Sequence, residues 1–157
     1  MDQVRIVTLI GAGKMGVKIA ARAALFGFEV RVYDVSKDTL RTADDLIRAD
    51  IQATCDEGAV KQDPQEAFGR VSFHPDLDGA IAGTDLIVEA VPENLDLKKE
   101  VFSDLDRIAA EHVIIATNSS SIPVSKIEDA VTRRDKVANI HFYARLNGIT
   151  PMVDLMG

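Results

Sequence analysis

Cysteine, tryptophan and long apolar runs are scarce or missing in this sequence. Its single cysteine, Cys55, excludes a disulfide within the chain. There is neither an apolar signal region nor a run of about 18 apolar residues, so the sequence predicts a cytoplasmic protein without a membrane span. The net charge of −7 argues against binding nucleic acid or anionic membrane through the overall field of the protein. Hydrophobic residues still make up 46% of the 157 positions, enough for one domain (1–157) with a sizeable core.

Strand-like segments alternate with helical segments, which is typical of a parallel sheet with crossover helices. We expect strands at 4–10, 28–33, 71–73, 85–91, 113–116 and 136–141, and a last short apolar run within 151–157. We expect helices at 17–26, 37–57, 78–82, 95–110 and 123–130, with a connector or short helix at 61–70. Ser36 is the expected N-cap of the long helix. The apolar stripes are expected to be Leu40, Leu46, Ile47 and Ile51 on that helix and Leu97, Val101, Leu105 and Ile108 on the helix 95–110.

A glycine-rich motif, Gly11-Ala12-Gly13-Lys14-Met15-Gly16, stands between the first strand and the first helix. In this position G-x-G-x-x-G permits a tight turn and brings backbone N–H groups and the helix dipole to a pyrophosphate. Asp34, 18 residues after Gly16, ends the second strand and can accept hydrogen bonds from ribose hydroxyls. Its carboxylate would repel a 2′-phosphate, which favours NAD over NADP, although the nearby Lys37 could soften that preference. The alternative is a glycine-rich turn without a ligand. The pattern as a whole predicts an α/β, Rossmann-type doubly wound, mainly parallel sheet with helices on both faces.

Polar residues follow the later strands, where ligands bind in doubly wound sheets. His141 ends the strand 136–141 and is the natural acid/base for exchanging a proton with an alcohol or ketone. Ser120 could hydrogen-bond the substrate oxygen, and Asp154, the only acid downstream of His141, could orient its ring. Glu93 and Lys98 follow the fourth strand. Alternatives without a catalytic role stay open. His141 could be a hydrogen-bonded histidine at a strand end, residues 119–121 could be a helix-capping turn, and Asp154 could be a solvated surface acid.

Several other chemistries receive no support from the sequence. The three consecutive serines lack a G-x-S-x-G elbow, which argues against a hydrolase. No His, Cys and Asp spacing indicates a metal site. His74 and His112 are expected in surface loops, and Cys55 is expected to be a partly buried, inert thiol.

These motifs together resemble the NAD-binding domain of the 3-hydroxyacyl-CoA dehydrogenase family over nearly the whole chain. Beyond the glycine loop, the resemblance rests on Glu89-Ala90-Val91-Pro92-Glu93-Asn94-Leu95 with Lys98, on Thr117-Asn118-Ser119-Ser120-Ser121, and on His141-Phe142. The resemblance implies that His141 is the catalytic acid/base and that Ser120 contacts the substrate oxygen. It also implies that Asp34 binds NAD and that Glu93 and Lys98 lie near its nicotinamide half. The cofactor-binding set is therefore expected to be Gly11, Gly13, Lys14, Met15, Gly16, Asp34, Glu93, Lys98 and Ser120, and the catalytic set His141, Ser120 and Asp154.

The sequence departs from the family pattern at three places. Ala144 and Arg145 replace the Asn-Pro expected after His-Phe-x. Asp154 lies one residue later than the family's glutamate partner of the histidine and is one methylene shorter. Acidic residues, Asp56 and Glu57, stand where the family often carries lysines for CoA, and acids would repel CoA phosphates.

The resemblance implies an NAD-dependent oxidoreductase that interconverts 3-hydroxyacyl-CoA and 3-ketoacyl-CoA in fatty acid metabolism. The family's C-terminal helical domain, which carries the dimer contact, is not in this sequence. We therefore expect weak activity or none from this chain alone and a homodimeric full-length protein. Two alternatives remain: a dehydrogenase of a free 3-hydroxy acid without CoA, and a nucleotide-binding module without catalysis.

Overall fold

The computed structural model describes residues 4–143 and, for the backbone, residues 153–156. The strands are β1 (Ile6–Ile10), β2 (Glu29–Tyr33), β3 (Val71–His74), β4 (Leu86–Glu89), β5 (Ile114–Thr117), β6 (Val137–Phe142) and β7 (Val153–Met156). The helices are α1 (Lys14–Leu25), α2 (Lys37–Asp56), α3 (Pro64–Phe68), α4 (Leu77–Ile81) and α5 (Leu95–Ile108). Each expected strand and helix is present within a few residues of its expected bounds, except in the segment 123–130.

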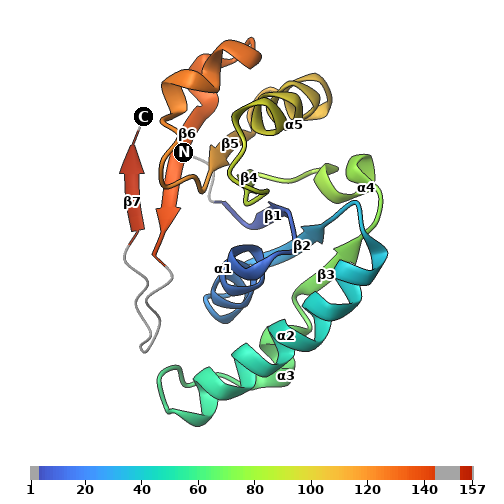
Figure 1. Ribbon diagram of the computed structural model, residues 1–157. Helices are drawn as coiled ribbons and strands as arrows, with labels where there is room; N and C mark the ends of the chain where they lie inside the picture. The colour runs from blue at the N-terminus through green and yellow to red at the C-terminus, as the bar shows by residue number, and fades with distance from the viewer. Residues whose placement is uncertain (1–3, 144–152, 157) are drawn as a thin grey trace.

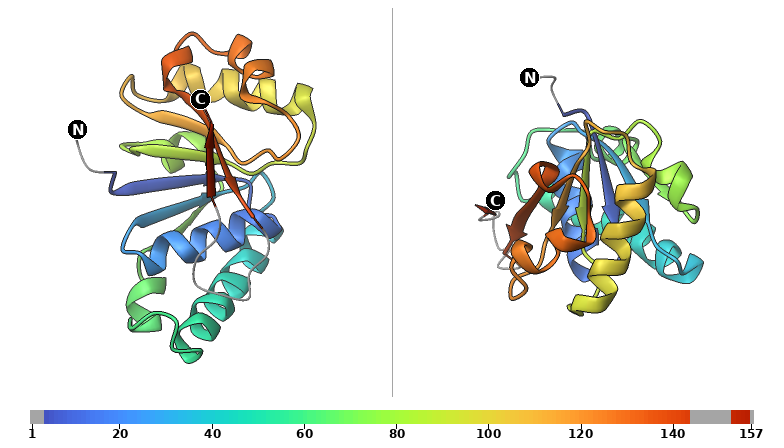
Figure 2. Two further views of the ribbon diagram at one scale, coloured as in Figure 1. Left: turned by 90° about the vertical axis from the view of Figure 1, so that its left-hand side faces the viewer. Right: turned by 90° about the horizontal axis from the view of Figure 1, so that it is seen from above.

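All seven strands form one sheet, in the order β3-β2-β1-β4-β5-β6-β7. The pairs from β3 to β6 are parallel, and β7 pairs antiparallel with β6 at the edge (Figure 2). After β1 the chain builds outward through β2 and β3, then returns to place β4 on the other side of β1. That reversal leaves a crevice beyond the carboxyl ends of β1 and β4, where ligands bind in open α/β sheets. The predicted Rossmann-type, mainly parallel fold is confirmed.

Helices cover both faces of the sheet (Figure 1). One core forms beneath α1, α2 and α3 and includes Leu9, Val32 and Ile47. The other forms beneath α4 and α5 and includes Ile87 and Phe102. Because both faces are covered, the central strands are apolar on both sides rather than alternating, as β1 (IVTLI) shows.

The long helix α2 begins as expected, but its buried stripe differs at one position. The Ser36 hydroxyl accepts a hydrogen bond from the backbone N–H of Thr39, which confirms Ser36 as the N-cap. Leu46, expected in the stripe, is half exposed, whereas Ala43 is buried. The buried positions on α2 are Leu40, Ala43, Ile47, Ile51 and Thr54, so the small Ala43 is buried where Leu46 was expected.

Three other expectations need correction. The segment 123–130 forms two single 3₁₀ turns, Val124–Lys126 and Glu128–Ala130, rather than a helix. The buried Ile127 between them holds the segment against the core, and the segment is too short for a stable α-helix. His74 ends β3 rather than lying in a loop, and its ring accepts or donates a hydrogen bond with the Ser72 hydroxyl at 2.9 Å. On α5 the fully buried positions include Lys98 and Phe102, neither of which was expected there.

Candidate nucleotide-binding and active site

The glycine loop is shaped by close backbone contacts at two of its three glycines. Gly11 has a φ of +104°, and a Cβ there would lie 2.9 Å from the carbonyl oxygen of Ala90. A Cβ on Gly16 would lie 2.0 Å from the carbonyl oxygen of Gly11, so only glycine fits. Gly13 differs, because a Cβ there would meet no atom within 4 Å. The space beside Gly13 is therefore open to a ligand.

The N-terminus of α1 leaves backbone donors free beside that open space. Gly13 is the N-cap residue of α1, and no side chain caps the helix there. The N–H groups of the first turn therefore point outward with the positive end of the helix dipole. This arrangement fits the pyrophosphate of a dinucleotide, which needs close approach and N–H donors.

Asp34 closes the loop from the end of β2. Its Oδ2 accepts a hydrogen bond from the backbone N–H of Ala12 at 2.9 Å, and its Oδ1 accepts one from the N–H of Ser36 at 2.9 Å. The carboxylate is thus held rigidly between the glycine loop and the start of α2. Each oxygen keeps a further lone pair, so Asp34 can still accept hydrogen bonds from a sugar hydroxyl.

A cleft of about 770 Å³ extends from the glycine loop past the ends of β1, β2 and β4. Its walls are mainly apolar, which suits a base and sugar more than a chain of phosphates. The walls are formed by Ile10, Gly11, Gly13, Lys14, Met15, Tyr33, Asp34, Val35, Thr39, Leu77, Ala90, Val91, Pro92, Leu97, Glu100, Val101 and Asp104. We call this space the loop cleft.

A second cleft of about 330 Å³ lies beyond the ends of β4, β5 and β6. It brings together Ser120 and His141 with Glu93 and Lys98, four residues that the sequence placed at one site. The remaining walls are formed by Met15, Ala90, Val91, Asn118, Phe142 and Tyr143. We call this space the histidine cleft. It shares Met15, Ala90 and Val91 with the loop cleft, so the two clefts lie side by side, and we call the pair the groove.

His141 lies near the end of β6, with its ring in an edge-on contact with Tyr143 at 4.4 Å between centroids. The backbone register of β6 and β7 sets His141 directly across from Asp154. The side chain of Asp154 lies outside the described residues. Ala144 and Arg145, the departures from the family pattern, also lie outside them.

Glu93 anchors the loop that follows β5. We call residues 119–121, three consecutive serines, the serine loop. The Oε1 of Glu93 accepts hydrogen bonds from the hydroxyls of Ser119 and Ser121 at 2.5 and 2.7 Å and from the backbone N–H of Ser121 at 3.1 Å. Burial raises the pKa of Glu93, but these hydrogen bonds together with the Lys98 ammonium lower the pKa to about 2. Glu93 is therefore an anion at any physiological pH.

Lys98 is buried and bound to carboxylates. Its Nζ lies 2.7 Å from Oε1 and 3.0 Å from Oε2 of the fully buried Glu89, and 3.4 Å from Oε2 of Glu93. Most of its charge is thus neutralised by the protein, although the side chain still borders the histidine cleft. Glu89 was not among the predicted site residues. An acid at the end of the otherwise apolar strand Leu86-Ile87-Val88-Glu89 is the signal that could have identified it.

Two asparagines tie the serine loop to β6. Asn118 Oδ1 accepts a hydrogen bond from the backbone N–H of Phe142 at 2.8 Å. Asn139 Nδ2 donates to the carbonyl oxygen of Ser119 at 2.9 Å. These bonds fix the loop that carries Ser120 to β6, the strand that carries His141.

No group of three or more potential metal-binding side chains occurs within the described ranges 4–143 and 153–156. In the same ranges, no helix has the length and apolar character needed to cross a membrane.

Comparison with known proteins identifies the relatives of this fold. A family model described as the 3-hydroxyacyl-CoA dehydrogenase NAD-binding domain matches residues 6–156. The mitochondrial hydroxyacyl-coenzyme A dehydrogenase of Rattus norvegicus is 36% identical over 146 residues, which cover 89% of this chain and 46% of the rat protein. A 5-formyl-3-hydroxy-2-methylpyridine 4-carboxylate 5-dehydrogenase of Mesorhizobium japonicum is 29% identical over 153 residues, covering 98% of this chain and 48% of that protein.

Solved structures agree with these relatives. The structure of a diketoreductase, described as performing dual catalysis on dicarbonyl compounds, superimposes with a TM-score of 0.90 at 34% identity. The match covers 98% of this chain and 55% of that one. The chain therefore spans about half the length of the curated relatives it matches.

Proposed function

The chain belongs to the family of 3-hydroxyacyl-CoA dehydrogenase NAD-binding domains, and we propose that it binds NAD and forms the catalytic half of an enzyme that oxidises a 3-hydroxyacyl-CoA to the 3-keto form. One observation carries this proposal. The groove has a dinucleotide-type glycine loop in one cleft and His141 and Ser120 in the adjoining cleft.

The proposed chemistry divides between cofactor and protein. NAD, when bound, supplies the hydride acceptor. His141 takes the hydroxyl proton of the substrate on a ring nitrogen as the C3–O bond becomes a carbonyl, and returns it in the reverse direction. Ser120 Oγ hydrogen-bonds the same substrate oxygen and holds it toward the imidazole. Asp154, across from His141 in the backbone register, orients the ring and stabilises its protonated form.

Cofactor binding is assigned to residues along the groove. The glycine loop, with Lys14 and Met15, receives the pyrophosphate, and Asp34 receives the adenosine ribose. Glu93 and Ser120 border the histidine cleft, where the nicotinamide half would lie, with Lys98 behind them.

A second candidate is a dehydrogenase of a free hydroxy acid. The exposed Asp56 and Glu57 at the end of α2 favour it, because they repel the phosphates of CoA. The Mesorhizobium relative, whose name specifies a pyridine carboxylate, supports the same candidate. A homodimeric full-length protein and a cytoplasmic location stay predictions.

Turnover in the full-length protein tests the proposal. With NADH, acetoacetyl-CoA should be reduced faster than acetoacetate, and His141→Ala should lower kcat at least a hundredfold while leaving NADH affinity unchanged. His112→Ala, which removes an exposed histidine, is the control and should not alter kcat. A preference for free acetoacetate would replace the CoA proposal by the second candidate. Tight NADH binding without turnover of either compound would indicate a nucleotide-binding module.

A further inference from the structure

Five side chains form a closed ring beneath the histidine cleft. Starting at Glu89, the ring runs to Lys98 (2.7 Å), Glu93 (3.4 Å), Ser119 (2.5 Å), Thr117 (3.1 Å, through the backbone N–H of Ser119) and back to Glu89 (2.7 Å). Its members come from β4, β5, α5 and the loops that follow the two strands. A single connected network therefore joins the elements that border this cleft, apart from α1 and β6.

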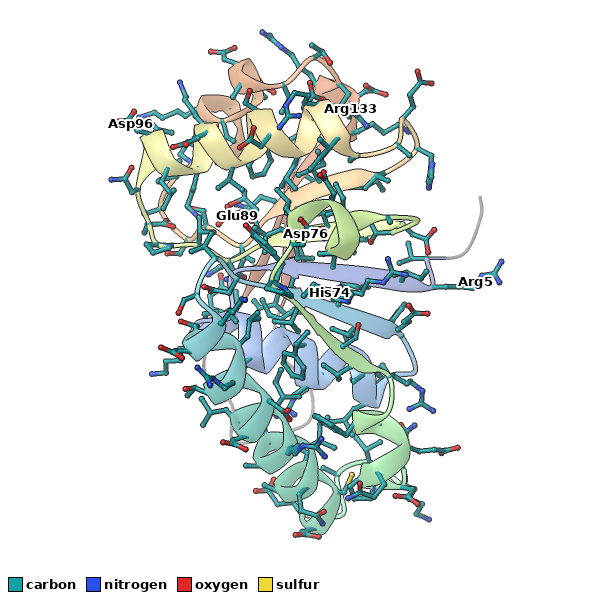
Figure 3. The ribbon with its side chains drawn as sticks, turned by 90° about the vertical axis from the view of Figure 1, so that its right-hand side faces the viewer. Arg5, His74, Asp76, Glu89, Asp96 and Arg133 are labelled. Carbon is teal, nitrogen blue, oxygen red and sulfur yellow. The ribbon has the colours of Figure 1, made fainter. Side chains whose placement is uncertain are left out.

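Glu89 connects both strands of the ring to Lys98. Its Oε1 also accepts a hydrogen bond from the backbone N–H of Val91 at 2.7 Å, and its Oε2 accepts one from the Thr117 hydroxyl. The residue is fully buried, and Figure 3 shows it in the interior between the sheet and α5, whereas Arg5 projects from the far end of β1. None of its oxygens faces the groove, so Glu89 cannot itself touch substrate or cofactor.

The ring controls where Glu93 and the serine loop lie. Lys98 is held by both oxygens of Glu89, and from there its ammonium reaches Glu93. Glu93 in turn binds Ser119 and Ser121, the residues on either side of Ser120. Removing the charge of Glu89 would leave a desolvated ammonium that must find another partner, and Glu93 is the nearest carboxylate.

We propose that Glu89 is a positioning residue of the histidine cleft: by holding Lys98 and Thr117 it sets the placement of Glu93 and of the loop that presents Ser120. The proposal rests on the proposed function for its consequence in cofactor binding, but the placement itself can be tested without that function. A buried pair that served stability alone could be replaced by neutral groups with no effect on the cleft.

Three variants separate positioning from stability. Glu89→Gln removes the charge and keeps the shape. The double variant Glu89→Gln with Lys98→Met removes both charges, so no ion stays buried alone. Asp106→Asn is the control, because Asp106, on the same helix as Lys98, forms a largely buried pair with Arg133 away from the cleft. Each is measured for unfolding by urea, for NADH binding by nucleotide fluorescence, and for the backbone amide signals of 119–121 by NMR.

We expect Glu89→Gln to lower stability, to shift the amide signals of 119–121 and to weaken NADH binding about tenfold, the effect of one lost charge-assisted hydrogen bond. The double variant should regain stability yet keep the shifted amide signals of 119–121. Asp106→Asn should lose stability and leave NADH binding and the three amides unchanged. A double variant with the amide signals of the original chain would overturn the proposal. If the original chain bound no NADH, the proposed function would fail, and the amide signals would still decide the role of Glu89.

Discussion

Gly13 and Gly16 lie three residues apart, but a side chain would clash with the backbone at Gly16 and would meet open space at Gly13. A methyl group at Gly16 meets the Gly11 carbonyl oxygen at 2.0 Å, whereas at Gly13 it meets nothing within 4 Å. We predict that Gly16→Ala lowers the free energy of unfolding by about 3 kcal/mol, because α1 must move away from the loop. Gly13→Ala should lower it by only about 0.5 kcal/mol, the difference between glycine and alanine at an N-cap.

Although Gly13→Ala should have little effect on stability, it should have a large effect on NADH affinity. Its methyl group would fill the space that a pyrophosphate needs, so Gly13→Ala should weaken NADH binding strongly in a protein that is still folded. Urea unfolding followed by circular dichroism, with a fluorescence titration of NADH, measures both effects. Equal destabilisation by the two substitutions would contradict the packing argument, and unchanged NADH affinity in Gly13→Ala would contradict the placement of the phosphates.

Glu93 provides a prediction about pH. Its pKa of about 2 in the folded chain lies below the ordinary value of 4.5, so the ionised form favours folding. That contribution is fully present above pH 4.5 and is lost as the pH falls from 4.5 toward 2. The carboxyl carbon signal of Glu93, followed by NMR, should titrate near pH 2. The stability difference between the original chain and Glu93→Gln should shrink over the same range. A midpoint near 4.5 would mean that the serine hydroxyls do not hold this carboxylate.

At the residue scale the sequence predicted side chains at the ends of strands better than buried ion pairs. The glycines, an acid after β2 and a histidine near the end of β6 are recognisable because motif and strand end coincide. Lys98 was predicted as a cofactor-binding residue, but its burial against Glu89 was not, because an acid at the end of an apolar strand and a lysine on a helix do not reveal a pair when each is considered alone. Only the fold shows that they neutralise each other. Leu46 was misplaced for a related reason: a hydrophobic stripe does not say which of two neighbouring positions is buried.

The C-terminal end of α5 is closed by an arginine from a distant turn. Arg133 donates from Nη2 to the carbonyl oxygens of Asp106 and Ala109 and from Nη1 to that of Ala110, and its Nε pairs with Asp106 at 2.7 Å (labelled in Figure 3). We predict that Arg133→Gln lowers the free energy of unfolding by about 2 kcal/mol, since these carbonyls and a largely buried carboxylate lose their partner.

The neighbouring Arg134 is the matched control for this prediction. It pairs with Asp129 at 3.0 Å, but both side chains are more than half exposed. Arg134→Gln should therefore change the free energy of unfolding by less than about 0.5 kcal/mol. Chemical denaturation of both variants measures the two changes in the free energy of unfolding. Similar losses would show that the contacts of Arg133 with the end of α5 stabilise the chain no more than an exposed ion pair does.

Elements with a complete set of local signals were predicted closely. The helix α2 has a capping serine, a periodic stripe and a glycine beyond its end, and its observed bounds differ from the expected ones by one residue. The segment 123–130 lacks such signals, and its 3₁₀ turns follow from how Ile127 packs in the core. The conformation of a short segment depends on tertiary packing, which cannot be seen in a single sequence.

For the whole molecule, the reversal of strand order at β1 and β4 creates the groove. Residues from Gly11 to His141 meet there because parallel strands carry their ends to the same edge of the sheet. This convergence was predictable from the alternation of strands and helices. The sizes of the two clefts and their shared wall were not, because they depend on side-chain packing at Met15, Ala90 and Val91.

The preference for NADH over NADPH should depend on the negative charge of Asp34 in the loop cleft. We predict that the chain binds NADH much more tightly than NADPH and that Asp34→Asn narrows this preference about tenfold, because a negative charge facing the 2′-phosphate is removed. Asp38→Asn is the control, since Asp38 is exposed on the first turn of α2 and its charge is screened by water. Fluorescence titrations with both nucleotides measure the ratio. Equal binding by the original chain would overturn the role assigned to Asp34.

The two clefts should respond separately to the two halves of the cofactor. ADP-ribose carries the adenosine and pyrophosphate without nicotinamide, so it should shift the amide signals of 11–15 and 34 and leave those of Ser120 and Phe142 unchanged. NADH should shift both sets, because its nicotinamide half extends past the shared wall into the histidine cleft. Two-dimensional NMR of the labelled chain with each ligand makes the comparison. If ADP-ribose shifted both sets of amide signals alike, binding in the loop cleft alone would alter the serine loop. The prediction that the two clefts respond separately would then be wrong.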